Sequence, residues 1–315
     1  MTKRKKVVVV GSSNTDMVVR LRRLPAPGET LLGGRFAMLA GGKGANQAVA
    51  AVRAGGQVSF IGRVGRDDLG ERALAGLVKE GIDVQGVSRD ESEPSGVALI
   101  LVSAAGENSI AVSPGANGRL SPRHISRAAK VFSKASVVLL QLETSLASVR
   151  VAARLADKVG ACVILNPAPA TRLPRELLRN VSVLTPNESE AEALTGIRVT
   201  DRASAARAAR RLHDQGVKTV IITLGSRGAY VSSNSMRELV SGYRVKAIDT
   251  TGAGDVFNGA LAVALAEGLE LRAAVRFANA AAARSVTRRG AQASAPSRHA
   301  ILRLISARKR AFVRR

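Results

Sequence analysis

Short runs of apolar residues alternate with longer segments of helical character along most of this chain. The apolar runs are continuous rather than alternating with polar residues, which is typical of strands buried on both faces. Such strands form a largely parallel sheet that helices cover on both sides. We therefore predict an α/β fold with a doubly wound, mostly parallel sheet flanked by helices. The predicted strands are 7–10, 58–61, 137–140, 162–165, 181–184 and 219–223, and the predicted helices include 45–54, 69–80, 146–159, 188–194 and 203–215.

Two segments interrupt this alternation. Residues 29–39 and 95–112 have the pattern of antiparallel strands, and the second contains a turn at 104–107. Strands without a following helix do not easily join a parallel sheet. We therefore expect a small antiparallel β lid, inserted from about 14–40 and 95–112, over a site or at a dimer surface. No linker divides the rest, so residues 1–315 are expected to form one domain with a basic C-terminal tail at about 303–315.

The net charge is strongly positive, at +24 from 48 basic and 24 acidic residues. Removing the ten basic residues of the two tails from +24 leaves +14 for the remainder. A basic surface attracts nucleic acid, membranes or phosphorylated substrates without identifying any of them. The chain has no Trp, two Tyr and six Phe, which disfavours binding of single-stranded nucleic acid by stacking. Because no known nucleic-acid module accompanies the charge, a nucleic-acid partner is not expected.

Cysteine and histidine are too sparse for a disulfide framework or a zinc site. Cys162 is the only cysteine, and the three histidines lack metal-ligand spacing. No apolar run approaches the roughly 18–20 residues that a membrane span needs, and the basic start lacks a signal-peptide pattern. We therefore expect a cytoplasmic protein without a membrane partner.

The segment 249–260 contains the strongest chemical signal. Its small residues precede an Ala- and Leu-rich helix, where free backbone N–H groups and the helix dipole favour an anion. Asp255 would repel a phosphate if holding it were the only role. The carboxylate fits better as a base that takes a proton from an attacking hydroxyl while the N–H groups stabilise a transferring phosphoryl group. Taken alone, the segment is equally compatible with a purely structural role, in which Asp255 caps the helix and the glycines turn the chain.

A second glycine loop, 41–48, also opens a helix. It is not a Walker A loop, because Lys43 is followed by Gly44 rather than Ser or Thr. Residues 11–14 likewise lack the Rossmann glycine fingerprint. The loop does bring Lys43 and Asn46 close to bare backbone, which suits a ligand with many hydroxyl groups.

Several such motifs occur together along the chain. They are 11–16 (GSSNTD), 27–30 (PGET), 41–48 (GGKGANQA), 166–170 (NPAPA), 185–190 (TPNESE), 223–228 (TLGSRG) and 249–259 (DTTGAGDVFNG). Over about residues 7–298 the chain therefore resembles the ribokinase-type family of sugar and nucleoside kinases. The motifs stand in the order of that family, which makes a chance match very unlikely.

The resemblance implies a role for particular residues. The catalytic base would be Asp255, and the anion hole would be the backbone of Gly252, Ala253 and Gly254. The sugar would contact Asn14, Asp16, Gly42, Lys43, Asn46, Glu143 and Asp255. ATP would contact Asn187, Thr223, Gly225, Ser226, Gly228, Gly254 and Asn279. Glu190 would hold Mg²⁺ through water, and a potassium ion would be held at Asp249, Thr251, Ser285, Arg288, Gly290 and Ser294.

The implied activity is ATP-dependent phosphorylation of D-ribose at O5, by a homodimer associated through its lid strands. Alternatives within the family are kinases for deoxyribose, fructose, a nucleoside or a sugar phosphate. A nucleoside pocket usually needs an aromatic partner, and a sugar phosphate needs a further cation. A different class remains open, namely a non-catalytic basic protein that associates with nucleic acid on the same scaffold. Intact Asp255, Asn187 and Glu190 disfavour that alternative.

Overall fold

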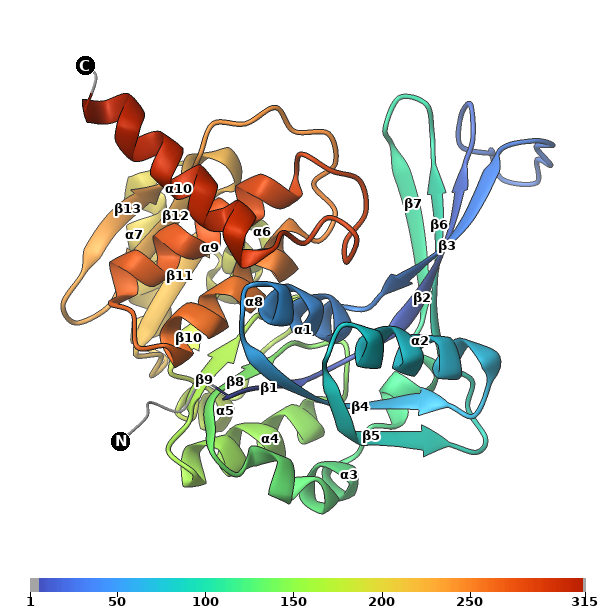
Figure 1. The fold of residues 1–315 in the computed structure, drawn as a ribbon, viewed down its shortest axis with the longest axis horizontal. Coiled ribbons are helices and arrows are strands. Elements are labelled where there is room, and N and C mark those ends of the chain that lie inside the picture. The colour runs from blue at the N-terminus through green and yellow to red at the C-terminus, as the bar shows by residue number, and fades with distance from the viewer. Residues whose placement is uncertain (1–5, 314–315) are drawn as a thin grey trace.

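A nine-stranded sheet forms the centre of the molecule (Figure 1). The structure is a computed structural model that describes residues 6–313. The sheet is parallel except for its last two strands, which join one edge as antiparallel neighbours. In spatial order the strands are β13 (Arg237–Ser241), β12 (Gly228–Ser232), β11 (Thr219–Thr223), β10 (Val183–Leu184), β9 (Cys162–Leu165), β8 (Ala135–Leu140), β1 (Lys6–Val10), β4 (Gln57–Gly65) and β5 (Asp83–Asp90).

Helices cover both faces of this sheet and create two cores. Val7 and Val9 of β1 join one core, whereas Val8 and Val10 join the other, as expected when side chains alternate across a buried strand. The first core is covered by α1 (Lys43–Arg53), α2 (Asp68–Lys79), α8 (Ala253–Ala266), α9 (Leu271–Ser285) and α10 (Arg298–Val313). The second is covered by α3 (Pro122–Arg127), α4 (Leu146–Lys158), α5 (Arg175–Leu178), α6 (Glu188–Thr195) and α7 (Arg202–His213). Three short 3₁₀ turns are η1 (Gly115–Arg119), η2 (Ala129–Phe132) and η3 (Gly225–Arg227).

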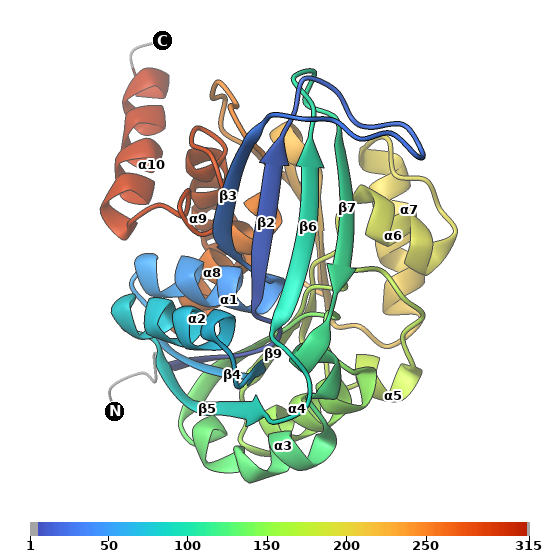
Figure 2. The same cartoon turned by 90° about the vertical axis from the view of Figure 1, so that its right-hand side faces the viewer.

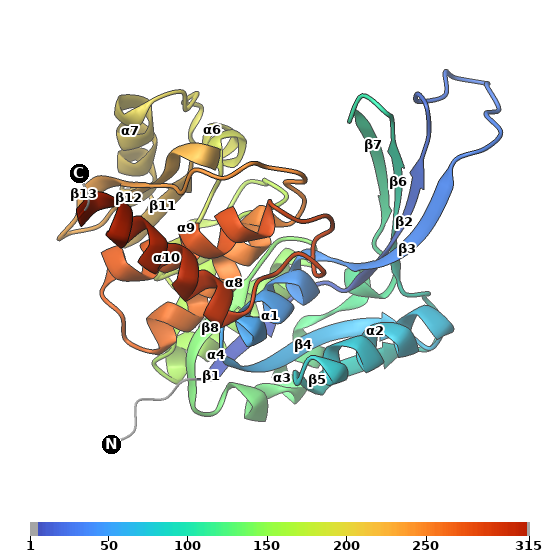
Figure 3. The ribbon, with the colours of Figure 1, turned by 45° about the horizontal axis from the view of Figure 1, so that its top comes forward.

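A separate four-stranded sheet, which we call the lid, extends from one side of this body (Figures 2 and 3). Its outer pairs are antiparallel hairpin-like pairs, but its two central strands, β2 and β6, run parallel. The lid is therefore mixed rather than purely antiparallel, because its two halves leave the body in the same direction. Its spatial order is β3 (Arg35–Gly41), β2 (Asn14–Arg20), β6 (Gly96–Val102) and β7 (Asn108–Ser113).

The predicted α/β architecture is confirmed, with differences at the edges of both sheets. All six predicted body strands are present, whereas β5, β12 and β13 were missed. The edge strands β5 and β13 carry polar residues on their exposed faces, whereas β12 is an inner strand of five buried residues. The basic tail expected from about residue 303 lies within α10 as far as Val313. The basic residues of 1–5 and 314–315 lie outside the described residues. Within residues 6–313, no helix is both long and apolar enough to cross a bilayer.

Candidate active site

Helix α8 begins at a glycine turn that exposes its positive end. The N-cap, Gly252, has a φ of 71°, and a Cβ there would lie 2.9 Å from the Cβ of Ala291. Backbone N–H groups in a first turn have no carbonyl partner inside the helix. That of Ala253 donates to the Thr250 carbonyl at 3.2 Å, whereas a Cβ at Gly254 would have no neighbour within 4 Å. An anion can therefore approach the backbone closely at Gly254.

The carboxylate of Asp255 lies in this first turn and is only 7% exposed. The side-chain amides of Asn46 and Gln47 on α1 each donate to it at 3.0 Å. The two helices approach this closely because Gly259 has no side chain, and a Cβ there would lie 2.6 Å from the Gln47 carbonyl oxygen. Burial raises the pKa of Asp255, although the charge of Lys43 and the two amide bonds oppose that rise. The arrangement favours a positioned proton acceptor.

Four more ionisable groups surround Asp255. Burial alone would lower the pKa of Lys43, but its carboxylate neighbours, Asp255 first among them, raise it overall. The pKa of Asp16 is raised to about 6 by burial and by the charges of Glu143 and Asp255. Burial likewise raises the pKa of Glu190. The charge of Asp255 adds to this rise, whereas the charge of Lys43 opposes it. The lid, α1, α6, α8 and the loop after β8 thus contribute to one charge cluster.

The base of the lid fixes the orientation of Asn14. The side chain of Asn117, in η1, donates to the Asn14 Oδ1 at 2.7 Å and to the Ser13 carbonyl at 3.0 Å, and accepts the Ser13 N–H at 2.9 Å. Because its oxygen is occupied, Asn14 is left with its NH₂ group for a ligand. Gly42, with a φ of 86°, passes so close that a Cβ would lie 2.7 Å from the Asn14 backbone nitrogen.

The same region offers acceptors suited to hydroxyl groups. Glu143 Oε2 accepts from the Ser12 hydroxyl at 2.5 Å and from the Lys43 N–H at 2.9 Å, which ties the loop after β8 to the start of α1. Among the described residues, the Asn46 Oδ1 is buried without a hydrogen-bond partner. A buried acceptor of this kind is costly unless a ligand donates to it. The site therefore suits a ligand that carries several hydroxyl groups.

A second group of predicted residues lies at the ends of β10 and β11. Asn187 is the N-cap of α6, where its side chain accepts the Glu190 N–H at 2.8 Å and Glu190 accepts the Asn187 N–H at 2.9 Å. Thr223 forms a parallel bridge with Asn187, and the exposed turn η3, which includes Gly225 and Ser226, follows it. A Cβ at Gly228 would lie 2.2 Å from the Val240 carbonyl oxygen, so the turn requires glycine there.

Asp249 joins two loops beside the start of α8. Its Oδ1 accepts the Thr251 N–H and its Oδ2 accepts the Gly290 N–H, both at 2.9 Å. Burial would raise the pKa of Asp249, but these hydrogen bonds and the charge of Arg20 lower it overall. The structure thus brings together three of the residues predicted for a monovalent cation.

The remaining predicted residues make local contacts. The hydroxyls of Ser285 and Ser294 donate to carbonyls three residues earlier, at 2.8 and 2.9 Å. The Asn279 amide donates to the Val240 carbonyl at 3.0 Å and so binds α9 to β13. The backbone N–H of Arg288 donates to the Ser285 carbonyl at 2.9 Å. These side-chain contacts lie outside the cluster around Asp255.

Residues 4–298 match the model of the pfkB family carbohydrate kinases. The chain belongs to this family. It is 45% identical to a ribokinase of Haemophilus influenzae, over 96% of this chain and 99% of that protein. It is also 40% identical to a ribokinase of Bacillus subtilis, over 95% and 99% of the two chains. A solved ribokinase of Arabidopsis thaliana, complexed with ribose and ATP, matches with a TM-score of 0.88 and 35% identity, over 95% of this chain and 98% of that one.

Two residues that support the site of this carbohydrate kinase were not identified from the sequence. Gln47 was noted only within its glycine loop, and Asn117 was not noted at all. Gln47 accepts from the Gln141 amide at 2.6 Å while donating to Asp255, so a chain of amides supports the carboxylate. The signal for Gln47 is its place directly after Asn46 at the start of a helix. Asn117 offers no comparable signal, because its partners lie 103 and 104 residues away.

Proposed function

We propose that this carbohydrate kinase transfers the γ-phosphoryl group of ATP to O5 of D-ribose and releases ribose 5-phosphate and ADP. The observation that carries the proposal is the buried Asp255 carboxylate at the start of α8, held by two amides from the helix that follows the 41–44 loop. Full-length similarity to ribokinases supports ribose as the sugar.

In this mechanism the oxygen of the 5-hydroxyl attacks phosphorus, and Asp255 accepts the proton of that hydroxyl. The backbone N–H groups of Gly252 and Gly254 would stabilise the charge that develops on the phosphoryl oxygens, and that of Ala253 would join them by leaving the Thr250 carbonyl, to which it donates at 3.2 Å. Lys43 balances the surrounding carboxylates and keeps Asp255 able to ionise despite its burial. Phosphoryl transfer depends mainly on positioning and electrostatics, which a rigid helix terminus supplies.

The sugar is proposed to occupy the space between the lid base and α1. Asn14 would donate to a sugar oxygen, whereas Asp16, Glu143 and Asn46 would accept from its hydroxyl groups. Lys43 and the bare backbone at Gly42 would complete the pocket. Asn14 is left with donors because its side-chain oxygen already accepts from Asn117. Asn46 is left with an acceptor because its NH₂ group already donates to Asp255.

The nucleotide is proposed to lie along Asn187, Thr223 and the 225–228 turn, with Asn279 on the adjoining helix. Magnesium fits this region through water, because Glu190 is a half-buried carboxylate beside the site and already accepts from Asn187. Within residues 6–313 no group of three or more His, Cys, Asp or Glu side chains is arranged to hold a metal directly. Magnesium retains much of its hydration and would neutralise charge on the ATP phosphates.

We also propose potassium as an activator at the loops that Asp249 joins. Carboxylate and carbonyl oxygens are suitable donors for a hard cation, and the contacts of Asp249 with Thr251 and Gly290 place such oxygens beside the anion hole. Ser285, Arg288 and Ser294 would complete the site mainly through backbone oxygens. The ion would stiffen the turn without touching the sugar.

A homodimer through the lid is proposed from its exposed apolar side chains. The strand register places Phe36, Met38 and Leu99 on the face opposite Asp16, and they are 61%, 39% and 54% exposed. Replacing Phe36 and Leu99 with lysine should shift the sedimentation coefficient from dimer to monomer. An unchanged coefficient would contradict the proposal. A reducing, cytoplasmic setting is proposed from the lone thiol of Cys162.

One assay separates ribose from the alternatives. ADP release is measured with ribose, deoxyribose, fructose, adenosine and fructose 6-phosphate, each with and without K⁺. We expect ribose to give the highest kcat/KM and K⁺ to increase it. A margin of less than a few-fold would contradict the choice of ribose. Salt-dependent DNA binding without ATP turnover on any of these compounds would favour the nucleic-acid alternative.

A further inference from the structure

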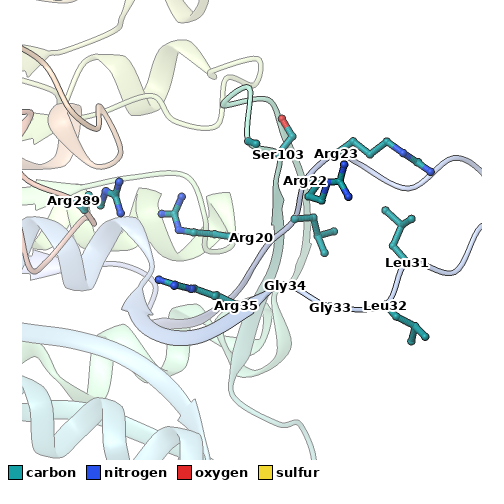
Figure 4. A pocket seen from close by; sticks show the side chains of 12 residues that line it. Arg20, Arg22, Arg23, Leu31, Leu32, Gly33, Gly34, Arg35, Ser103 and Arg289 are labelled. Atoms are coloured by element: carbon teal, nitrogen blue, oxygen red, sulfur yellow. The ribbon is translucent and has the colours of Figure 1, made fainter.

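A cavity of about 1000 Å³ lies between the outer part of the lid and the body, away from the residues assigned to sugar and nucleotide (Figure 4). Its lid wall is formed by the end of β2, the start of β3 and the loops beyond them, and its body wall includes Arg289. Arg20 and Arg35 extend from the lid toward Arg289 in Figure 4. We call the space between these three side chains the arginine cleft.

The arginine cleft has an excess of positive charge. Arg20 and Arg35 are directly opposite one another on β2 and β3, where two like charges are unfavourable. The lining of the whole cavity contains five arginines and no acidic residue. Of these five, Arg23 is paired with Glu29, whereas no ion pair within residues 6–313 involves the other four.

One carboxylate beside the cleft compensates only part of this charge. Arg20 acts electrostatically on Asp249 and contributes to its lowered pKa. Both Asp249 oxygens, however, already accept backbone N–H groups from Thr251 and Gly290. Asp249 is thereby fixed to its own loops. The cavity lining offers no acidic residue to Arg35 or Arg289.

We propose that the arginine cleft binds a phosphate-type oxyanion at a site separate from phosphoryl transfer. A guanidinium group presents a fork of donors that matches phosphate oxygens. Arg20 and Asp16 lie on the same face of β2, four residues apart, so the cleft is roughly 13 Å along the strand from the sugar-binding carboxylate. That separation exceeds the reach of a phosphate on a bound pentose.

The bound anion joins two parts of the molecule. Arg20 and Arg35 belong to the lid, whereas Arg289 belongs to the body loop whose next residue, Gly290, contacts Asp249. An oxyanion between them replaces mutual repulsion with attraction to a shared partner. The lid strands are then held closer to the body. Binding itself does not depend on the proposed function and is measured without sugar turnover.

The direct test is calorimetry with a non-hydrolysable ATP analogue present, so that the nucleotide phosphate site is already filled. Inorganic phosphate probes the free ion, and glycerol 3-phosphate probes a phosphoryl group carried on an organic molecule. We expect at least one to bind with a one-to-one stoichiometry. Binding of only one probe assigns the source of the anion, whereas binding of neither overturns the proposal.

Variants separate the cleft from the general basic surface. Arg20→Gln with Arg35→Gln should weaken binding at least tenfold, whereas Arg207→Gln with Arg210→Gln, on the exposed side of α7, should change it less than twofold. Equal weakening in both pairs would overturn the proposal, because it would reflect net charge alone. If the variant with Arg20→Gln and Arg35→Gln fails to fold, Arg289→Gln tests the contribution of the body to anion binding.

The anion should also slow amide hydrogen exchange in β2 and β3 of the wild type. Unchanged exchange would contradict the link between lid and body.

Discussion

The body sheet and the lid sheet are built from similar apolar residues but differ in how they are covered. In β8 five of six residues are buried, and helices pack on both faces of the strand. In β7 of the lid all six residues are exposed, although Ile110 and Val112 are as apolar as those of β8. The body therefore has a complete core, whereas the lid is a single layer whose outer strand β7 is left exposed.

The proposed active site lies where these two sheets meet. Asn14 and Asp16 begin the first lid strand, and Asn117 fastens that strand to the turn after β7. Asp255, Asn46 and Gln47 come from the packed helices of the body. A densely packed part thus holds the carboxylate proposed as the base, and a thinly covered part brings the groups proposed to bind the sugar.

The largest effect is expected at the rigid side of this junction. Asp255→Ala removes the proton acceptor, so kcat should fall about 10²–10⁴-fold, while KM for ribose changes much less. Asp255→Asn is the matched control, since it retains the shape and also loses the base. Steady-state ADP release measures both constants. A variant with near-normal kcat would contradict the role of Asp255.

The two sheets should also respond differently to the same substitution. Leu139→Ala in β8 leaves a cavity between fully packed neighbours and should lower the free energy of unfolding by about 2–5 kcal/mol. Leu99→Ala in the lid, where the side chain is 54% exposed, should change it by less than about 0.5 kcal/mol. Urea unfolding at low protein concentration measures both. Similar losses would show that the lid is covered in the monomer.

The body was largely predictable from sequence because its strands are buried on both faces. Continuous apolar runs such as 137–140 and 219–223 identify such strands directly, and the glycine loops before α1 and α8 mark where ligands are proposed to approach the backbone. The edge strand β13 was missed, since it contains Arg237 and Glu238 and has the polar composition of a loop. A local sequence pattern does not reveal whether a strand will lie at the edge of its sheet.

The site was predictable in its motifs and not in its supporting contacts. Asp255, Asn46 and Lys43 lie in glycine-rich segments that signal a ligand. Asn117 has no such segment, and its role depends on a chain reversal that brings η1 beside Ser13. The arginine cleft was equally hidden, because Arg20, Arg35 and Arg289 meet only once the lid stands over the body.

An intermediate effect is expected where the lid is fastened. Asn117→Ala removes the donor that occupies the Asn14 oxygen and leaves buried backbone groups of Ser13 unpaired. We expect KM for ribose to rise about tenfold, in line with loss of one well-placed hydrogen bond, with kcat altered little. Asn234→Ala, in the exposed turn between β12 and β13, is the matched control. Equal changes in kcat and KM would indicate general damage instead of lost positioning.

The smallest effect expected is a pH dependence of sugar recognition. The pKa of Asp16 is raised from 3.8 to about 6, so the carboxyl group is ionised at pH 7 and half protonated near pH 6. Protonation converts one acceptor into a donor, and kcat/KM for ribose at pH 6 should therefore be about half its value at pH 7. In Asp16→Asn, kcat/KM should be lower at both pH values, and the rise in KM between pH 7 and pH 6 should disappear. If KM still rises by the same factor in Asp16→Asn, the proton belongs to another group of the cluster, and the lid then contributes position without charge.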